Sequence, residues 1–215
     1  MLLFLFGLYQ ITCMRKLLLI TALCINIQAL FAQDSYIRPP EIGVSFIMND
    51  FVTPSRIRST SLAHVFNSKQ WAKFGEVGTG LAINYFQGLK EHIDFSATVA
   101  GSFVKNVLPN ENASDNSFLL EADAAANFKL FTDAYWFTPY VSAGLGAGMY
   151  KAHFSAIVPV GLGVKLNLFD EAAIFISSQY RIPVTTETNS YHLMHSIGIA
   201  GIIGQKKTGA SKDTQ

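Results

Sequence analysis

Residues 92–103 have the sequence HIDFSATVAGSF, and residues 118–130 have the sequence FLLEADAAANFKL. In both stretches, apolar side chains alternate with small or polar ones at every second position. Successive side chains of a β-strand point to opposite sides, so this period predicts two strands with unlike faces. Both stretches are long enough for a tilted strand that crosses a membrane, which needs ~9–11 residues.

The same period of two recurs along the chain, and the connections alternate between long segments and short turns. Long loops on one side and short periplasmic turns on the other are typical of outer-membrane barrels. The sequence therefore predicts an all-β fold, an eight-stranded antiparallel up-and-down transmembrane barrel over residues 41–204. The other six predicted strands are 41–49, 75–86, 138–151, 154–168, 173–182 and 191–203.

The composition agrees with a membrane barrel and excludes other classes. Of the 215 residues, 50% are hydrophobic and only 14% are charged, whereas a soluble domain carries about 25% charge. Beyond the N-terminus there is no run of ~20 apolar residues, which excludes a bundle of transmembrane helices. The formal net charge of +1 lacks the basic excess of a nucleic-acid binder, so no nucleic-acid partner is expected.

Alternation alone does not decide which face is outside, because a soluble lipocalin-like barrel has the same period with its apolar face inside. The polar face here consists mostly of Gly, Ala, Ser, Thr and Asn, which suit the narrow interior of eight strands. A water-facing exterior would be rich in Lys and Glu. Aromatic residues also gather at the short turns and predict a periplasmic aromatic girdle. Its members are Tyr85, Phe86, Phe131, Tyr135, Trp136, Phe137 and Phe169.

The N-terminus predicts export. Met14, Arg15 and Lys16 precede an apolar stretch that ends at Ala32, as in a secretory signal peptide. We expect a signal peptide at 1–32 with translation starting at Met14; an uncleaved membrane anchor is the alternative. Residues 33–40 are then a periplasmic lead-in and residues 205–215 a polar C-terminal tail. Both cysteines, Cys13 and Cys24, lie in the presequence, so no disulfide is expected in the mature chain.

Two stretches carry a family resemblance: FTPYVSAGLGAGMY at 137–150 and FSAIVPVGLGVKLNLFDEAAIFISSQYRIP at 154–183. They resemble OmpA-type eight-stranded outer-membrane β-barrels, most closely the porin-family or outer-membrane β-barrel domain proteins of Bacteroidota. The resemblance implies a barrel in the outer membrane of a Gram-negative bacterium. It departs from OmpA itself because the sequence shows no peptidoglycan-binding domain after the last strand.

Charged residues on the polar face of the strands predict two salt-bridge networks in the lumen, because a charge inside a narrow barrel needs a partner or water. Each network contains both signs, and His192 lies close to the outer one. A structural filling of the lumen is the first hypothesis, and a gate that passes small ions is the second. The outer network comprises Glu76, Glu121, Asp123 and Arg181, and the periplasmic one comprises Asp94, Lys129 and Lys165.

Candidates for other chemistry are few. His153 and Ser155 lie two residues apart at the outer rim, a pattern that some lipid A deacylases use, although no acid is assigned to orient the histidine. The histidines form no ligand-spaced cluster with cysteine, so no metal and no cofactor is expected. Loop 50–73 carries four basic residues against Asp50 alone and suits an anionic lipopolysaccharide surface or an extracellular partner.

These observations predict a non-enzymatic outer-membrane protein with a structural or surface-interaction role. The alternative is a narrow, low-conductance pore, and the third hypothesis is a lipid-modifying hydrolase. The expected partners are outer-membrane lipid and lipopolysaccharide, the barrel-assembly machinery during biogenesis, and an extracellular partner at loop 50–73.

Overall fold

The computed structural model describes residues 37–105, 117–168, 171–186 and 188–204. The predicted signal peptide, residues 33–36 of the lead-in, the C-terminal tail and Phe169 lie outside these residues. Within the described ranges the chain forms eight strands, two short α-helices and one 3₁₀ turn. They are β1 (Glu41–Asp50), α2 (Val52–Ser59), α3 (Leu62–Asn67), η1 (Phe74–Glu76), β2 (Gly78–Lys90), β3 (Ile93–Val104), β4 (Ser117–Lys129), β5 (Phe137–Tyr150), β6 (His153–Leu168), β7 (Ala172–Pro183) and β8 (His192–Ile202).

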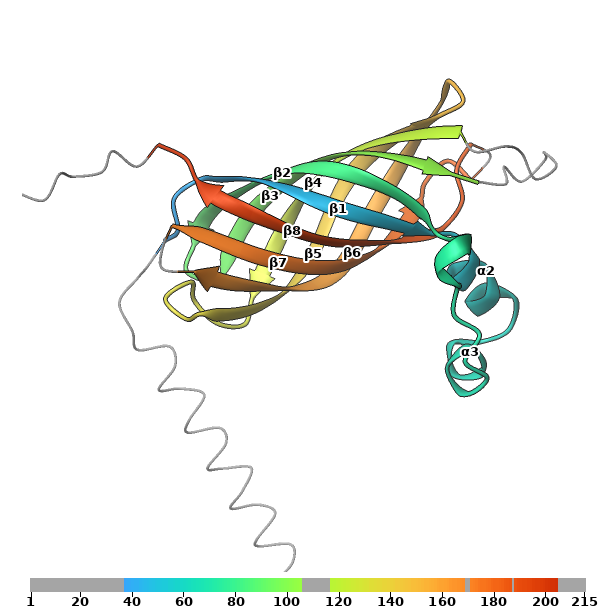
Figure 1. Cartoon of the computed structure of the whole chain (residues 1–215), viewed down its shortest axis with the longest axis horizontal. Coiled ribbons are helices and arrows are strands. Elements are labelled where there is room, and N and C mark those ends of the chain that lie inside the picture. Colours follow the sequence, from blue (N-terminus) through green and yellow to red (C-terminus); the bar gives the residue numbers. More distant parts are fainter. Residues whose placement is uncertain (1–36, 106–116, 169–170, 187, 205–215) are drawn as a thin grey trace, which may run out of the picture. The chain divides into compact units, whose positions relative to one another are not determined.

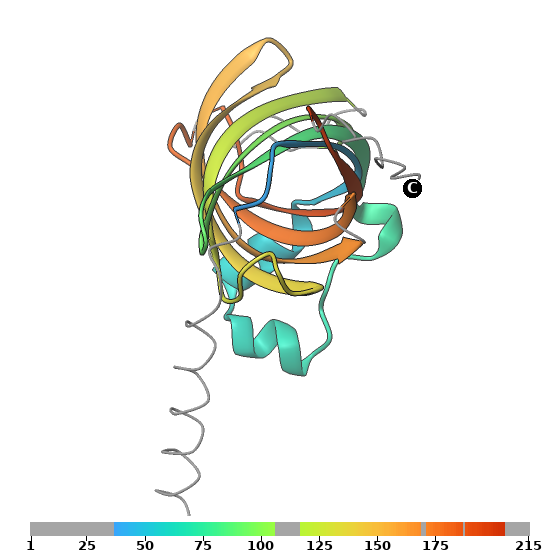
Figure 2. The same cartoon turned by 90° about the vertical axis from the view of Figure 1, so that its left-hand side faces the viewer.

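The strands form a closed barrel in which each one pairs antiparallel with its neighbours in the sequence (Figures 1 and 2). Strand β1 closes the ring by pairing with β8 from Glu41↔Ile202 to Asp50↔Leu193. Closure leaves no strand edge exposed, and so every strand can satisfy its backbone hydrogen bonds within a lipid bilayer. The predicted eight-stranded antiparallel barrel is therefore confirmed.

The burial pattern shows which face is outside. Along β1, Ile42, Val44 and Phe46 are exposed, whereas Glu41 and Ser45 are buried. The same alternation continues around the barrel and leaves a largely apolar outer surface around a more polar interior. A membrane barrel has its apolar face outside, whereas a soluble barrel has it inside. The small residues of the polar face predict the first of these arrangements.

The connections define the two ends of the barrel. At one end, which we call the short-turn end, residues 91–92 join β2 to β3 and residues 130–136 join β4 to β5. Ile203 N also donates to Pro40 O there, and this hydrogen bond keeps the start of β1 beside the end of β8. At the opposite, long-loop end, the described connections are residues 51–77, 184–186 and 188–191. There too, Lys151 and Ala152 make a tight turn between β5 and β6, with φ of 46° and 63°. Positive φ at both positions suits the twist of a two-residue hairpin.

Residues 51–77, which we call the L1 segment, differ from expectation. The sequence predicts a loop at 50–73, but α2 and α3 form there because local hydrogen bonds cap both helices. The Asp50 carboxylate accepts from Val52 N and Thr53 N at 2.8 and 2.9 Å, and Ser61 Oγ accepts from His64 N at 3.1 Å. Viewed along the barrel, α3 lies outside the ring of strands (Figure 2). L1 therefore projects to the side of the barrel mouth.

None of the helices in the described part of the chain has both the length and the apolar character needed to cross a membrane.

Candidate functional site

An ion cluster lies inside the barrel toward the long-loop end. Arg181 Nη2 lies 2.6 Å from Asp123 Oδ2, and Arg181 Nη1 lies 3.4 Å from Glu121 Oε2. His192 Nε2 lies 3.3 Å from Glu121 Oε1, and its Nδ1 lies 3.0 Å from Ser190 O. These side chains are almost completely buried. Three of the four residues predicted for the outer network thus meet, with His192 beside them.

Glu76, the fourth residue predicted for that network, does not lie in the lumen, and the prediction was wrong at this position. It belongs to η1, where its carboxylate accepts from Lys73 N at 2.8 Å and lies 3.8 Å from Arg56. Strand β2 begins only at Gly78, so the period of two that placed Glu76 on the inner face does not extend to it. This acid therefore also offsets Arg56, one of the four basic residues of the predicted loop.

A second ion cluster fills the short-turn end. Lys129 Nζ contacts Asp94 at 2.6 Å and also contacts Asp133, and Lys165 contacts Glu41. Glu41 in turn accepts from Arg38 Nε at 2.5 Å. Asp94, Lys129 and Lys165 therefore lie in the interior at the end where the sequence places them.

Three members of the short-turn cluster were missed: Arg38, Glu41 and Asp133. Arg38 and Asp133 lie outside the predicted strands, where a period of two carries no information. Arg38 is nevertheless 2% exposed and also donates to Ala172 O at 3.1 Å. Glu41 could have been found, because it lies in phase with Gly43 and Ser45 on the inner face of β1.

Apolar side chains fill the lumen as well, so the interior is not as polar as predicted. Phe51 packs against a buried group at the long-loop end and stacks on His192 with ring centroids 4.5 Å apart. Thus an apolar layer covers the long-loop ion cluster. The three buried apolar groups are Val104, Leu119 and Tyr150; Ile47, Ala82, Ala100 and Met194; and Phe86, Phe175 and Ala200.

Phe86, which the sequence predicts in the aromatic girdle, instead points inward. Its ring lies 5.0 Å from that of Phe175 and 5.0 Å from Lys165 Nζ. The physical reason is parity: Asn84 is an inner-face residue of β2, and Phe86 follows it by two.

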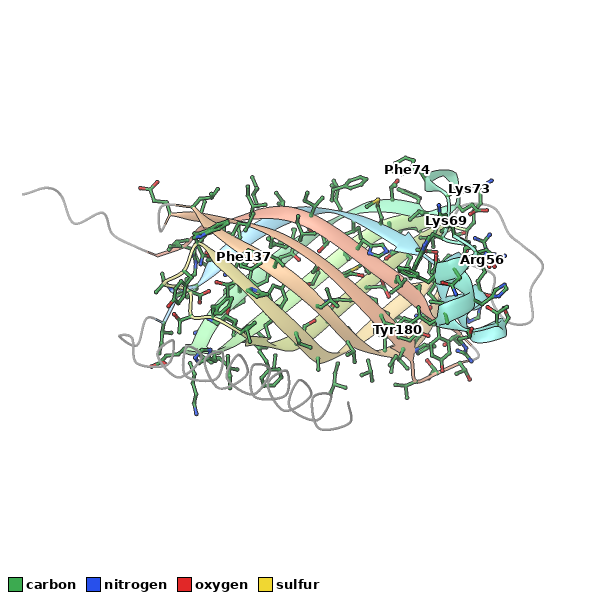
Figure 3. All side chains as sticks on the ribbon, turned by 90° about the horizontal axis from the view of Figure 1, so that it is seen from below. Arg56, Lys69, Lys73, Phe74, Phe137 and Tyr180 are labelled. Carbon is green, nitrogen blue, oxygen red and sulfur yellow. The ribbon has the colours of Figure 1, made fainter. Side chains whose placement is uncertain are left out.

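The remaining described members of the predicted girdle lie on or near the outer surface. Trp136 and Phe137 are exposed, with ring centroids 5.7 Å apart, and Phe131 and Tyr135 form a second pair at 5.8 Å. Figure 3 shows Phe137 at the opposite end of the barrel from Phe74. Tyr85 is half-buried against Phe95, and their ring centroids are 6.4 Å apart.

The His153–Ser155 pair is not arranged as a catalytic dyad. Ser155 is buried, and its hydroxyl donates to Gly148 O at 3.3 Å and accepts from Asn189 Nδ2 at 3.0 Å. A nucleophilic serine would instead direct its proton to the histidine that acts as base. Among the described residues, no group of three or more His, Cys, Asp or Glu side chains could hold a metal ion.

Basic and apolar side chains gather on L1. Arg56 donates to the carbonyls of Gln70 and Trp71, both at 3.1 Å, and so ties α2 to the returning chain. The Arg58 guanidinium lies 3.6 Å from the centroid of the Tyr191 ring. Figure 3 shows Arg56, Lys69, Lys73 and Phe74 together at the long-loop end.

Solved structures of outer-membrane proteins are similar to this chain. No protein-family model matches the sequence, and no curated protein sequence does. The outer-membrane protein OprG of Pseudomonas aeruginosa is similar over 77% of this chain and 96% of its own, with a TM-score of 0.54 and 10% identity. Neisserial surface protein A is similar over 79% and 99%, with a TM-score of 0.49 and 11% identity. The N-terminal barrel domain of Pseudomonas aeruginosa OprF is similar over 77% and 98%, with a TM-score of 0.45 and 13% identity.

At these identities the likeness is one of fold. The chain has the fold of an eight-stranded outer-membrane β-barrel protein. The OmpA-type and Bacteroidota details of the sequence resemblance stay predictions.

Proposed function

We propose that the protein is an integral outer-membrane barrel of a Gram-negative bacterium with a structural or surface-interaction role and no enzymatic activity. The observation that carries this proposal is the filling of the lumen by a buried ion cluster toward each end. The interior of an eight-stranded barrel is only wide enough for its own side chains. A filled interior leaves the outer surface and the loops as the parts that meet other molecules.

Opening the lumen would require separating buried ion pairs. At the long-loop end Arg181 holds two carboxylates, and Phe51 packs over His192 beside them. Withdrawing one partner of such a cluster leaves an uncompensated buried charge, which costs about 3–5 kcal/mol. These contacts support a closed barrel over the pore alternative. The hydrogen bonds of Ser155 likewise support a non-enzymatic role over the hydrolase.

In this proposal the predicted signal peptide at 1–32 directs export and the barrel-assembly machinery inserts the chain. The short-turn end then faces the periplasm and L1 faces outward, as in barrels with short periplasmic turns. Membrane lipid surrounds the apolar wall, and the L1 segment is the surface for lipopolysaccharide or an extracellular partner.

Planar-bilayer recording of the purified protein tests the closed barrel. We expect no unitary conductance steps over several hours at about ±100 mV, a potential large enough to move charges within membrane proteins. Reproducible steps of one size would favour the pore. Cell fractionation together with the gel mobility of unheated and boiled samples tests the location, and recovery in a soluble fraction would contradict it.

A further inference from the structure

A pocket of about 290 Å³ lies between L1 and the outer wall of the barrel. Strands β1 and β8 contribute Met48, Leu193 and His195, and L1 contributes Trp71 and Phe74. Met48 and His195 are paired neighbours in the register, and both follow the parity of the outward-facing residues of their strands. The pocket is thus on the lipid-facing side of the wall, and its size is near the lower end of the ~300–1,000 Å³ typical of small-ligand sites.

The pocket continues the apolar surface that faces lipid. The next outward pair toward the short-turn end is Phe46↔Ile197, and both side chains are exposed. A hydrocarbon chain lying along Phe46 and Ile197 therefore continues directly to Met48, the next outward-facing residue of β1. Burial of such a chain contributes about 0.8 kcal/mol per CH₂ group.

Two lysines of L1 lie close to lining residues of the pocket in the sequence and at the same end of the barrel as Phe74 (Figure 3). Lys73 lies between Ala72 and Phe74, which both line the pocket, and Lys69 lies four residues before it. Both lysines are exposed, and within the part of the chain that the structure describes neither forms an ion pair.

The two nearby acids are already engaged. Asp50, which also lines the pocket, accepts from the N-terminus of α2 through Val52 N and Thr53 N. Glu76 lies beside Arg56 and accepts from Lys73 N. The charges of Lys69 and Lys73 are therefore available to an anionic ligand beside an apolar slot.

We propose that this pocket binds one acyl chain of lipid A, the phosphorylated and acylated disaccharide that anchors lipopolysaccharide, with a lipid A phosphate at Lys69 and Lys73. The inference rests on the proposed function, since it needs L1 on the outer side of the outer membrane, where lipopolysaccharide is the lipid. Trp71 and Phe74 cover the chain from the L1 side, and Met48 and Leu193 support it from the barrel. The occupant joins hydrocarbon to phosphate, as the largely apolar pocket adjoins two lysines of L1 in the sequence.

The test uses tryptophan fluorescence of the purified protein in detergent. The chain has two tryptophans, Trp71 and Trp136, so a Trp136→Phe form reports on the pocket through Trp71 alone. Titration with bisphosphorylated lipid A should shift the Trp71 emission to the blue and saturate. Phosphatidylglycerol, which also joins acyl chains to one phosphate, should bind at least tenfold more weakly.

Two variants and one control in the Trp136→Phe background separate the effect of charge from that of shape. Lys73→Gln should weaken lipid A binding about fivefold, the gain expected of one basic residue at an anionic lipid surface. Lys90 is an exposed lysine at the short-turn end. Lys90→Gln is therefore the matched control and should leave the affinity unchanged. Ala72→Phe fills the pocket and should lower the affinity more than tenfold.

Several results would overturn the inference. They are an unsaturable Trp71 response, equal affinity for phosphatidylglycerol, or an equal effect of Lys73→Gln and Lys90→Gln. The shift in gel mobility on boiling checks that each variant is folded, and the surface variant Lys73→Gln decides the matter even if Ala72→Phe does not fold. If the folded protein is in the outer-membrane fraction but does not bind lipid A, this inference alone is refuted. If the protein is absent from the outer-membrane fraction, the proposed function is refuted.

Discussion

Arg181 Nη2 lies 2.6 Å from Asp123 Oδ2, although the two residues are 58 positions apart in the sequence. The contact joins β7 to β4 through the interior of the barrel. The same guanidinium reaches Glu121, so one cation compensates two carboxylates in a space that admits few other groups. In the proposed closed barrel, this cluster would have to separate before the long-loop end could open.

Arg181→Met should lower the free energy of unfolding by about 3–5 kcal/mol, because it leaves Glu121 and Asp123 buried without their cation. The measurement is urea unfolding in liposomes, followed by tryptophan fluorescence. Arg58→Met removes an arginine that lies on the exposed side of L1 and should cost less than about 1 kcal/mol.

A triple variant separates the loss of an ion pair from a loss of packing. Glu121→Gln, Asp123→Asn and Arg181→Met together remove the charges at similar volume, so most of the stability should return. If Arg181→Met is no worse than Arg58→Met, the buried cluster does not stabilise the barrel.

Leu145→Arg tests whether the outer wall of the barrel faces lipid or water. Leu145 is 73% exposed on β5, and arginine near the bilayer midplane costs about 2–4 kcal/mol in membrane barrels. Folding into liposomes, compared by urea titration with the wild-type protein, should show this loss. Ala134→Arg is the control, since Ala134 is exposed in the turn at residues 130–136. Equal and negligible effects of the two substitutions would indicate a wall that faces water.

Gly80 is predicted to tolerate no side chain. A Cβ there would lie 2.1 Å from Gly101 O and 2.6 Å from Ser102 Cα, both backbone atoms that cannot move aside cheaply. Gly80→Ala should therefore destabilise the barrel by about 1–3 kcal/mol. At Gly201, also in a strand, a Cβ meets nothing within 4 Å. Gly201→Ala should be neutral or slightly stabilising in the same urea assay, and the prediction fails if the two alanines behave alike.

Arg56→Lys should loosen L1 while the barrel keeps its stability. Both hydrogen bonds leave from one nitrogen, Nη1. Lysine retains the charge, but its Nζ lies one bond closer to the backbone and does not reach that position. Chymotrypsin should then cleave L1 several times faster at its exposed aromatic residues, measured by mass spectrometry of timed digests. Lys90→Arg at the short-turn end provides the control. An unchanged cleavage rate would mean that Arg56 does not order the segment.

Local pattern in the sequence predicted most of the barrel. Alternation along a strand depends only on neighbouring residues, so the stretches 92–103 and 118–130 indicated both the strands and their two faces. The same parity places Asp94, Glu121, Asp123 and Lys129 in the interior without knowledge of any partner. Phe86 lies inside for this reason too, and strict use of the period would have placed it there.

Other features depended on where elements begin and on contacts between distant strands. Glu76 lies outside the lumen because β2 starts two residues later, and the lumen partner of Lys165 is Glu41 on β1. Met48 and His195 become neighbours because β1 pairs with β8. L1 then brings Trp71 and Phe74 back against them, and the four side chains line one pocket. The sequence by itself determined the strands, their faces and the closed barrel, since these follow from a local period. Only the tertiary structure decided which charges meet and where the pocket lies, because side chains far apart in the chain become neighbours only once register and closure are set.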